Sequence, residues 1–331
     1  MKLNFLYLVL LFFAFACEKD SNKVQLAIDN HCMPQETGPI IPYYKGPGFG
    51  FEIVQLDSFR YTMPYSNPNN KNEFVYFVYD YKLNNSGIYT YNILTKQKSL
   101  VLETDLRAKK RYPQSDIRWS RKGWLIFADF DNNIYKVKPN GDSLTQLTFS
   151  RNNFVPEWNL MGTMFCVQHY SNTLKIHFTI IFDEHGKNID TINYEGKQVI
   201  GNQPHWQHEK YILGSNDNGI VLYDYINDKV TEIRTGNLSM GFMRWINNDE
   251  FIYNGTNGIY TYNVSNNQIK QIRKMVNSNG YAYINLLDNK QIICQRNKTI
   301  NLDSLREILG VKSSICIINP CDTIVTDLDL R

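Results

Sequence analysis

Short runs of alternating apolar and polar residues follow one another from about residue 51 to the end of the chain, with short polar turns between them. The clearest unit spans residues 115–149 and contains four such runs, IRWS, WLIFADF, NIYKVKP and SLTQLTF. The turns between these runs, RKG, DNN and NGD, contain the Asn, Asp and Gly residues that tight hairpins favour. The unit is therefore predicted to be a four-stranded antiparallel meander.

The same arrangement recurs along the chain. A tryptophan marks the first strand of four units, and the four tryptophans, 39, 48 and 39 residues apart, are Trp119, Trp158, Trp206 and Trp245. One further unit precedes these four and one follows them, and the hexapeptide GIYTYN occurs at both 87–92 and 258–263. Six units of four strands predict an all-β fold, a six-bladed β-propeller in which each sheet packs between two neighbours through its tryptophan and its aromatic strands.

One segment departs from the strand pattern. In NLDSLREILG, residues 301–310, leucine and isoleucine recur at helical spacing, Asp303 can cap the first turn and Gly310 can end the last one. We therefore expect a short helix inserted between the second and third strands of the last blade.

The repeat resembles that of the TolB-type, WD-like propellers. Residues 119–148 follow the family pattern of W-S-x-x-G, an apolar strand, I-Y-x-x-x-x-x-G and L-T-x-L-T. The turn after the tryptophan, Ser-Pro-Asp-Gly in the family, is Ser-Arg-Lys-Gly at residues 120–123, whereas the glycine turn after the third strand is kept at Gly141 and Gly186. The resemblance covers about residues 60–331 and implies the fold. It implies no single function, because binding proteins, scaffolds and enzyme appendages all carry this repeat.

The N-terminal segment is predicted to direct export. Lys2 precedes an apolar run at residues 5–16, which is too short for a typical membrane-spanning helix. Cys17 follows small residues and begins a charged stretch, which resembles a bacterial lipoprotein signal and implies that Cys17 is lipidated, although Ala14 stands where that signal usually has Leu. The alternative is ordinary signal-peptidase cleavage after Ala16.

These patterns divide the chain into three expected parts. Residues 1–16 are a signal peptide, residues 17–50 a polar, Pro- and Gly-rich tether, and residues 51–331 the propeller. The tether contains no counterpart of the α/β domain that precedes the propeller in TolB, so we expect a role other than that of TolB itself. The lipoprotein resemblance implies an outer-membrane location, periplasmic or surface-facing, with a soluble periplasmic or secreted protein as the alternative.

The charge balance and the cysteine content exclude some classes of function. The 35 basic and 32 acidic residues are too evenly balanced for a nucleic-acid-binding protein. The sequence contains no CxxC pair, so a zinc site of that type is not expected. Beyond Cys17 the chain has an odd number of cysteines, Cys32, Cys166, Cys294, Cys316 and Cys321. Cys32 and Cys321 could join the tether to the C-terminus, and buried free thiols are an equally good interpretation of each cysteine.

Familiar catalytic and cofactor motifs are missing from the sequence. HWQHE at 205–209 lacks the HExxH spacing of a zinc helix, and DFDNN at 129–133 lacks the glycine and the distal glutamate of a calcium loop. No Walker, Rossmann or GxSxG pattern occurs. The sequence thus predicts no metal or cofactor, and it predicts a hairpin turn at DFDNN.

The best candidate site lies just before each tryptophan. Arg118, Glu157, His205 and Arg244 recur at the same point of the first strand, so we expect them to form a ring near the propeller axis. Polar residue type varies from blade to blade there, as it would on a ligand-binding face and equally on a solvated rim. We interpret these residues as candidate ligand contacts and assign no catalytic residue.

The sequence favours binding over catalysis. We expect a cell-envelope lipoprotein that works as a protein- or glycan-binding propeller scaffold, as a monomer or within a hetero-complex. One alternative is a polysaccharide-active lyase or hydrolase that assembles its carboxylates across the central face. A second alternative is a structural subunit of an outer-membrane assembly.

Overall fold

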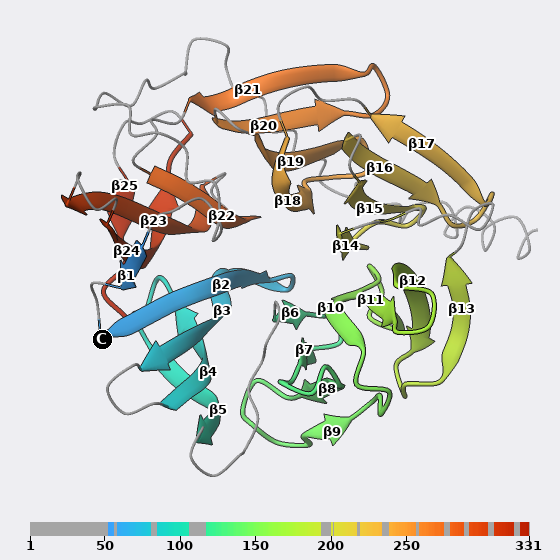
Figure 1. The fold of residues 1–331 in the computed structure, drawn as a ribbon, viewed down its shortest axis with the longest axis horizontal. Coiled ribbons are helices and arrows are strands. Elements are labelled where there is room, and N and C mark those ends of the chain that lie inside the picture. The colour runs from blue at the N-terminus through green and yellow to red at the C-terminus, as the bar shows by residue number, and fades with distance from the viewer. Residues whose placement is uncertain are drawn as a thin grey trace, which may run out of the picture.

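The computed structural model describes residues 52–55, 58–80, 85–105, 117–192, 200, 202–216, 219–233, 238–255, 258–274, 279–287, 291–303, 308–320 and 325–330. These residues form six β-sheets arranged around a common centre (Figure 1). Five sheets are four-stranded antiparallel meanders, and the sixth has five strands. The expected all-β, six-bladed propeller is confirmed.

Blades 1 to 5 each take four consecutive strands, whose order in the sheet is their order in the sequence. Blade 1 contains β2 (Phe59–Asn67), β3 (Asn70–Asp80), β4 (Asn85–Asn92) and β5 (Lys98–Asp105). Blade 2 contains β6 (Arg118–Trp119), β7 (Leu125–Ala128), β8 (Ile134–Val137) and β9 (Thr145–Gln146). Blade 3 contains β10 (Asn153–Trp158), β11 (Met164–Ser171), β12 (Ile176–Asp183) and β13 (Asn188–Ile192). Blade 4 contains β14 (Asn202–His205), β15 (Tyr211–Asn216), β16 (Gly219–Asp224) and β17 (Lys229–Ile233). Blade 5 contains β18 (Leu238–Trp245), β19 (Glu250–Gly255), β20 (Gly258–Asn263) and β21 (Gln268–Lys274).

Blade 6 joins the two ends of the described chain. It contains β22 (Asn279–Leu286), β23 (Ile292–Asp303), β24 (Ile308–Ile318) and β25 (Val325–Asp327). The N-terminal strand β1 (Glu52–Gln55) lies parallel to the first part of β24, while β25 is antiparallel to its last part. A strand from before blade 1 therefore completes the last blade, which closes the ring.

The helix expected at residues 301–310 is not confirmed, because residues 301–303 and 308–310 belong to strands. Strand β23 runs through Asp303, β24 begins at Ile308, and Asn301 is paired with Leu309 across the two strands. Residues 304–307 lie outside the described part. At residues 308–310, pairing with both β1 and β23 favours the strand conformation over the helical spacing of the sequence.

Hydrophobic clusters lie between every pair of neighbouring blades. Alternate residues of one strand face opposite neighbours: Leu125 and Phe127 pack with blade 1, whereas Ile126 and Ala128 pack with blade 3. The tryptophans belong to four of the six clusters, and Trp158 and Trp206 have no exposed surface. The predicted role of the tryptophans in packing between blades is confirmed.

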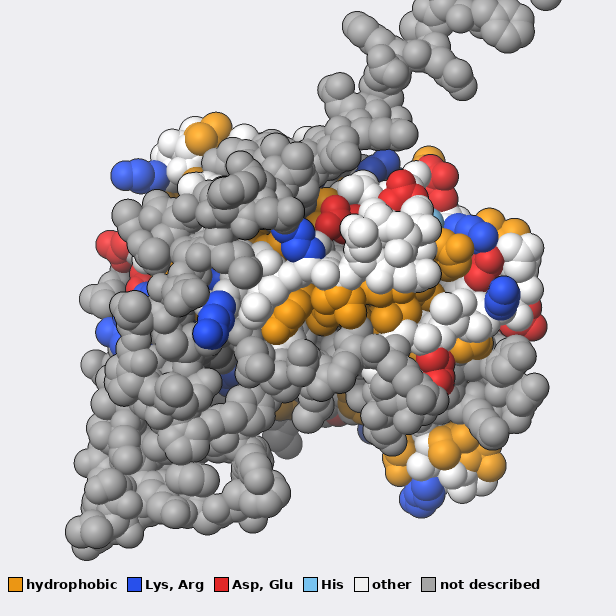
Figure 2. Space-filling model, turned by 90° about the horizontal axis from the view of Figure 1, so that it is seen from above, with side chains coloured by type: hydrophobic (Ala, Val, Ile, Leu, Met, Phe, Trp, Pro, Cys, Tyr) orange, Lys and Arg blue, Asp and Glu red, His pale blue; other side chains and the backbone are white. Residues whose placement is uncertain are grey.

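The outermost strands carry charges that discourage pairing with other chains. Lys98, Asp190, Lys229 and Lys274 all lie on such strands. Figure 2, which views the molecule from the side of β20 and β21, shows a band of hydrophobic side chains bordered by polar and charged ones. Exposed apolar residues on outer strands include Ile189 and Ile269.

The predicted export signal, Cys17, Cys32 and Cys321 fall outside the described residues. Among the residues that are described, no helix is long and apolar enough to span a membrane.

Candidate functional site

The four residues before the tryptophans occupy equivalent positions on the innermost strands. Each lies opposite an apolar residue of the second strand, and the pairs are Arg118–Ile126, Glu157–Cys166, His205–Leu213 and Arg244–Ile252. The same register places Tyr65 and Asn285 at this position in blades 1 and 6. We call the six residues the polar ring, and each is at most 4% exposed.

Bulges shape the strands that carry the ring. The pairing of the first two strands shifts register just before the ring residue in blades 1, 3, 4, 5 and 6. In three of these bulges the residue two positions before the ring residue has a positive φ. These residues are Met63 at 57°, Val155 at 46° and Tyr283 at 53°. This conformation is costly for a β-branched residue such as Val155. Bulges of this kind increase the local twist of a strand and change the direction in which its side chains point.

Glu157 is the centre of the ring. Arg118 Nε donates to Glu157 Oε2 at 2.6 Å, and the Tyr65 hydroxyl donates to Oε1 at 3.1 Å. Gln207 Nε2 also approaches Oε1, at 3.4 Å, and His205 Nε2 lies 3.9 Å from Oε2. One buried carboxylate thus joins side chains from blades 1, 2, 3 and 4.

Tyr65 lies near two guanidinium groups from different blades. The Cζ atoms of Arg118 and Arg244 are 5.1 Å and 5.2 Å from the centre of its ring. Cation–π attraction in a desolvated site contributes roughly 2 kcal/mol. Because Arg244 belongs to blade 5, these contacts extend the network across the axis.

Further hydrogen bonds join blade 6 to blade 1. Asn285 Nδ2 donates to the carbonyl oxygen of Pro64 at 2.8 Å, and Thr62 Oγ1 bonds to Gln295 Oε1. The ring residue of blade 6 therefore contributes to the junction at which the propeller closes.

Burial dominates the ionisation of the ring. Desolvation raises the pKa of Glu157, although the charges of Arg118 and Arg244 oppose this. Burial and the neighbouring Glu157 raise the pKa of Tyr65, so its hydroxyl stays protonated and donates. Burial, Arg244 and Arg118 hold the pKa of His205 well below its ordinary value, and neither ring nitrogen of His205 has a hydrogen-bond partner among the described residues. His205 is therefore neutral at pH 7.

The structure brings all four sequence-predicted residues together but buries them. They contact one another and Tyr65 rather than solvent. Their role as ligand contacts remains a prediction. Sequence reasoning missed Tyr65 and Asn285 because blades 1 and 6 lack the tryptophan. Alignment of the six repeats could have identified them, since both residues precede the position that the tryptophan takes in the other blades.

The HWQHE and DFDNN segments, which resemble metal-binding motifs, have structural roles in the hairpins. His208 is separate from His205: its Nε2 lies 3.0 Å from the Asn248 carbonyl oxygen, and its ring centre is 4.3 Å from that of Trp245. In DFDNN, Asp129 Oδ1 accepts hydrogen bonds from the backbone N–H groups of Asp131 and Asn133, which confirms the predicted hairpin turn. Among the described residues, no cluster of His, Cys, Asp and Glu could hold a metal ion.

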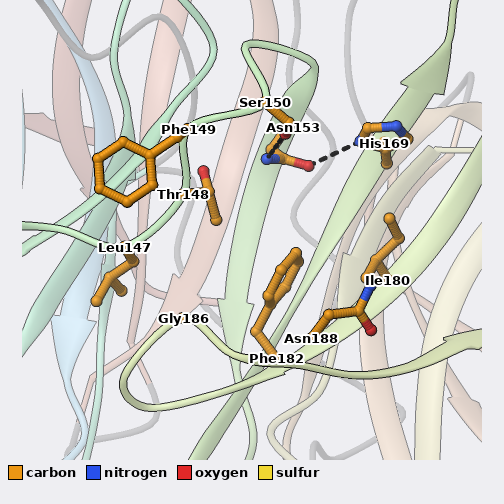
Figure 3. Close-up of a pocket in the computed structure, with 10 residues that line it drawn as sticks. All are labelled: Leu147, Thr148, Phe149, Ser150, Asn153, His169, Ile180, Phe182, Gly186 and Asn188. Carbon is orange, nitrogen blue, oxygen red and sulfur yellow. Dashed lines mark hydrogen bonds between the residues drawn. The ribbon is translucent and has the colours of Figure 1, made fainter.

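A pocket of about 270 Å³ lies between blades 2 and 3 (Figure 3). Blade 2 and the connection to blade 3 contribute residues 147–150, and blade 3 contributes Asn153, His169, Ile180, Phe182, Gly186 and Asn188. Asn153 is fully buried, with its Oδ1 2.9 Å from His169 Nδ1 and its Nδ2 2.7 Å from Ser150 Oγ. Phe149, at one edge, is 76% exposed. The sequence offered no signal for this pocket, because residues on two blades form it.

Two of the cysteines are neighbours in blade 6. Cys294 and Cys316 lie opposite each other on β23 and β24, with their Sγ atoms 3.5 Å apart and both side chains buried. Burial and the proximity of Cys316 raise the pKa of the Cys294 thiol. Cys166 is a third buried free thiol.

No protein-family model matches the chain, and no curated protein matches it. Solved structures do match. A protein assigned as TolB from Agrobacterium tumefaciens superposes with a TM-score of 0.53 at 11% identity, over 82% of this chain and 89% of that one. The propeller domain of the Trilobed protease from Pyrococcus furiosus gives 0.52 at 12% identity, over 81% and 83% of the two chains.

An enzyme appears among the similar structures as well. The oligogalacturonate lyase of Vibrio parahaemolyticus has a TM-score of 0.52 at 12% identity, over 81% of this chain and 77% of that one. At such identities the likeness concerns the fold and not the activity. The comparisons therefore show that the chain has the fold of the TolB-like β-propellers.

Proposed function

We propose that this chain is a lipid-anchored propeller of the cell envelope that binds a protein or a glycan. The observation that supports a binding role is the location of the polar side chains, some buried at the axis and others at an accessible pocket. The titratable residues that converge on the axis are buried, and Glu157 is hydrogen-bonded there to Arg118 and Tyr65, whereas the pocket beside Phe149 is accessible. Catalytic groups must reach a substrate, and recognition groups must lie on an accessible surface.

The anchor can be tested on the full chain in its membrane. We expect mass spectrometry of the membrane-extracted protein to find a diacylglycerol on an N-terminal Cys17, and Cys17→Ser to move the protein into the soluble fraction. Cys166→Ser should leave the protein in the membrane. An unmodified Cys17 at the mature N-terminus would exclude the lipid anchor.

The binding role is tested by chemical cross-linking on intact cells, followed by purification of the chain and identification of what is attached to it. We expect an envelope protein or a polysaccharide to be attached. A chain that is recovered without a cross-linked partner contradicts the scaffold function. Recovery in one fixed stoichiometry within a larger complex would favour a structural subunit of an outer-membrane assembly instead.

A polysaccharide-active lyase or hydrolase is the second candidate. The observations favouring it are the fold shared with oligogalacturonate lyase and the meeting of Glu157, His205 and Arg118 at the axis. Incubation with polygalacturonate, followed by measurement of unsaturated products and reducing ends, decides the matter. Turnover that disappears in Glu157→Gln would support an enzyme, and the absence of turnover would reject cleavage of this substrate.

A further inference from the structure

The pocket between blades 2 and 3 has the size of a site for one small ring. Its volume of about 270 Å³ lies near the lower end of the roughly 300–1,000 Å³ typical of small-molecule sites. It can hold one ring of a larger ligand, with the rest of that ligand outside on the surface.

The lining carries no fixed charge. It consists of aliphatic, aromatic, hydroxyl and amide residues, a glycine and His169. Burial lowers the pKa of His169, with His177 as a further cause, so the imidazole is neutral at pH 7. A charged ligand would lose its hydration without gaining a counter-charge, which is costly. The pocket therefore selects a neutral group.

The lining also combines apolar surface with a polar group. Leu147, Ile180 and Phe182 supply apolar surface, with the amide of Asn188 beside Phe182 and Ile180, while Asn153, His169 and Ser150 form a hydrogen-bonded group (Figure 3). Because Asn153 is fixed by both neighbours, this polar group is preorganised. A ligand that fits needs an apolar face and several hydrogen-bonding groups at its edge.

We propose that this pocket binds a neutral sugar ring of a glycan. A pyranose has a face of C–H groups that can pack on Phe182 and on the exposed ring of Phe149, and an edge of hydroxyl groups that can bond to amides and imidazole. An apolar side chain of a protein partner could fill the apolar part of the pocket, but it would offer no hydrogen-bonding group to the polar residues of the lining. The proposal rests on the proposed binding function and specifies its ligand class.

Titration of the purified full chain with neutral sugars tests the proposal. The probes are the methyl glycosides of glucose, galactose, mannose and N-acetylglucosamine, with glucuronate and galacturonate as charged counterparts, and binding is followed by ligand-observed NMR and calorimetry. We expect at least one neutral glycoside to bind more tightly than either uronate.

Substitutions at exposed positions then locate the site. Phe149→Ala should weaken binding of that glycoside roughly tenfold, while Phe149→Tyr should preserve it, because an aromatic face remains. Asn188→Ala, at a second exposed lining residue, should also weaken binding. Leu94→Ala is the matched control, since Leu94 is 73% exposed on blade 1, far along the chain from the pocket, and this variant should bind as the wild type does.

Three results would overturn the proposal: no neutral glycoside binds, uronates bind better, or Phe149→Ala binds as tightly as the wild type. If sugars fail while an envelope protein still cross-links to the cell-bound chain, the pocket is not a sugar site and the scaffold function stands. If sugars bind in vitro while the cell-bound chain cross-links to nothing, the pocket proposal stands and the scaffold function fails.

Discussion

Single residues at the axis hold the blades together through polar rather than apolar contacts. Glu157 accepts hydrogen bonds from Arg118 and Tyr65, and Tyr65 in turn lies near Arg244. These side chains come from four of the six blades, blades 1, 2, 3 and 5. A buried polar network of this kind requires that its members be satisfied, because an unpaired charge in a low-dielectric interior is costly.

Removal of the Glu157 carboxylate should destabilise the propeller strongly. Glu157→Ala leaves the Arg118 guanidinium buried without this partner, and we expect the free energy of unfolding to fall by about 3–5 kcal/mol. Urea denaturation measures the change. The control is Lys122→Ala, which breaks the exposed Lys122–Glu184 ion pair and should cost less than about 1 kcal/mol. Equal losses in the two variants would refute the central role of Glu157.

His205 should make the fold less stable in mild acid. The pKa of His205 in the folded protein is well below the ordinary value of 6.5. In mild acid the unfolded chain therefore binds a proton at His205, whereas the folded chain does not. The free energy of unfolding therefore falls as the pH drops below 6.5. Between about pH 7.5 and about pH 5.5, wild type should lose about 1 kcal/mol more than His205→Gln. Identical losses in urea titrations at the two pH values would show that His205 does not titrate in this way.

At the scale of elements, glycine turns bring neighbouring blades into contact. Gly141 follows β8 and Gly186 follows β12, and both have a φ of +87°. A Cβ atom on Gly141 would lie 2.6 Å from the Val101 carbonyl oxygen of blade 1, and one on Gly186 would clash with the carbonyl oxygen of Leu147, which follows β9 of blade 2. The glycines that the repeat pattern kept thus allow both the turn and the approach of the next blade.

Gly186→Ala should destabilise the protein more than alanine does at Gly123, a glycine that also has a positive φ but at which an added Cβ has no atoms close to it. It combines a left-handed backbone with a clash, and we expect a loss of about 2–4 kcal/mol. Gly123 also has a positive φ, but a Cβ there would meet nothing within 4 Å. Gly123→Ala should therefore cost only about 1 kcal/mol. Comparison of the two thermal unfolding midpoints tests this, and similar midpoints would contradict close packing at Gly186.

The hairpin of β23 and β24 places two thiols where oxidation can join them. After refolding in a glutathione redox buffer, we expect Cys294 and Cys316 to form a disulfide. The two thiols lose two protons and two electrons, which reduce one glutathione disulfide to two glutathione thiols. The bond should add about 3 kcal/mol to the free energy of unfolding. Peptide mapping after alkylation detects it, with Cys166 expected to remain alkylated. Alkylation of both blade 6 cysteines would show that no bond forms.

At the scale of the whole molecule, strand β1 converts an array of blades into a closed ring. It pairs with β24 in parallel, at Glu52 to Gln55, although the rest of blade 6 comes from the other end of the chain. The pairing joins segments more than 250 residues apart at a junction that Asn285 also bridges. Without it, the first part of β24 would be an open sheet edge.

A truncation that removes β1 should weaken the ring. A chain beginning at residue 58 lacks β1, and we expect it to unfold with a free energy lower by about 2–5 kcal/mol than a chain beginning at residue 51, because several interstrand hydrogen bonds are lost. Guanidinium denaturation of the two purified chains provides the measurement. Equal stability of the two chains would mean that β1 does not hold the propeller closed.

The sequence by itself determined the strands, the six units and the equivalence of Arg118, Glu157, His205 and Arg244, because alternation, turn residues and repeats are local signals. Tertiary structure decided the rest. It placed residues 301–303 and 308–310 of the expected helix in strands, since pairing between β23, β24 and β1 outweighs helical spacing there. It also buried the polar ring with Tyr65 and Asn285 and formed the pocket beside Phe149, because distances between side chains on different blades arise only when the ring closes.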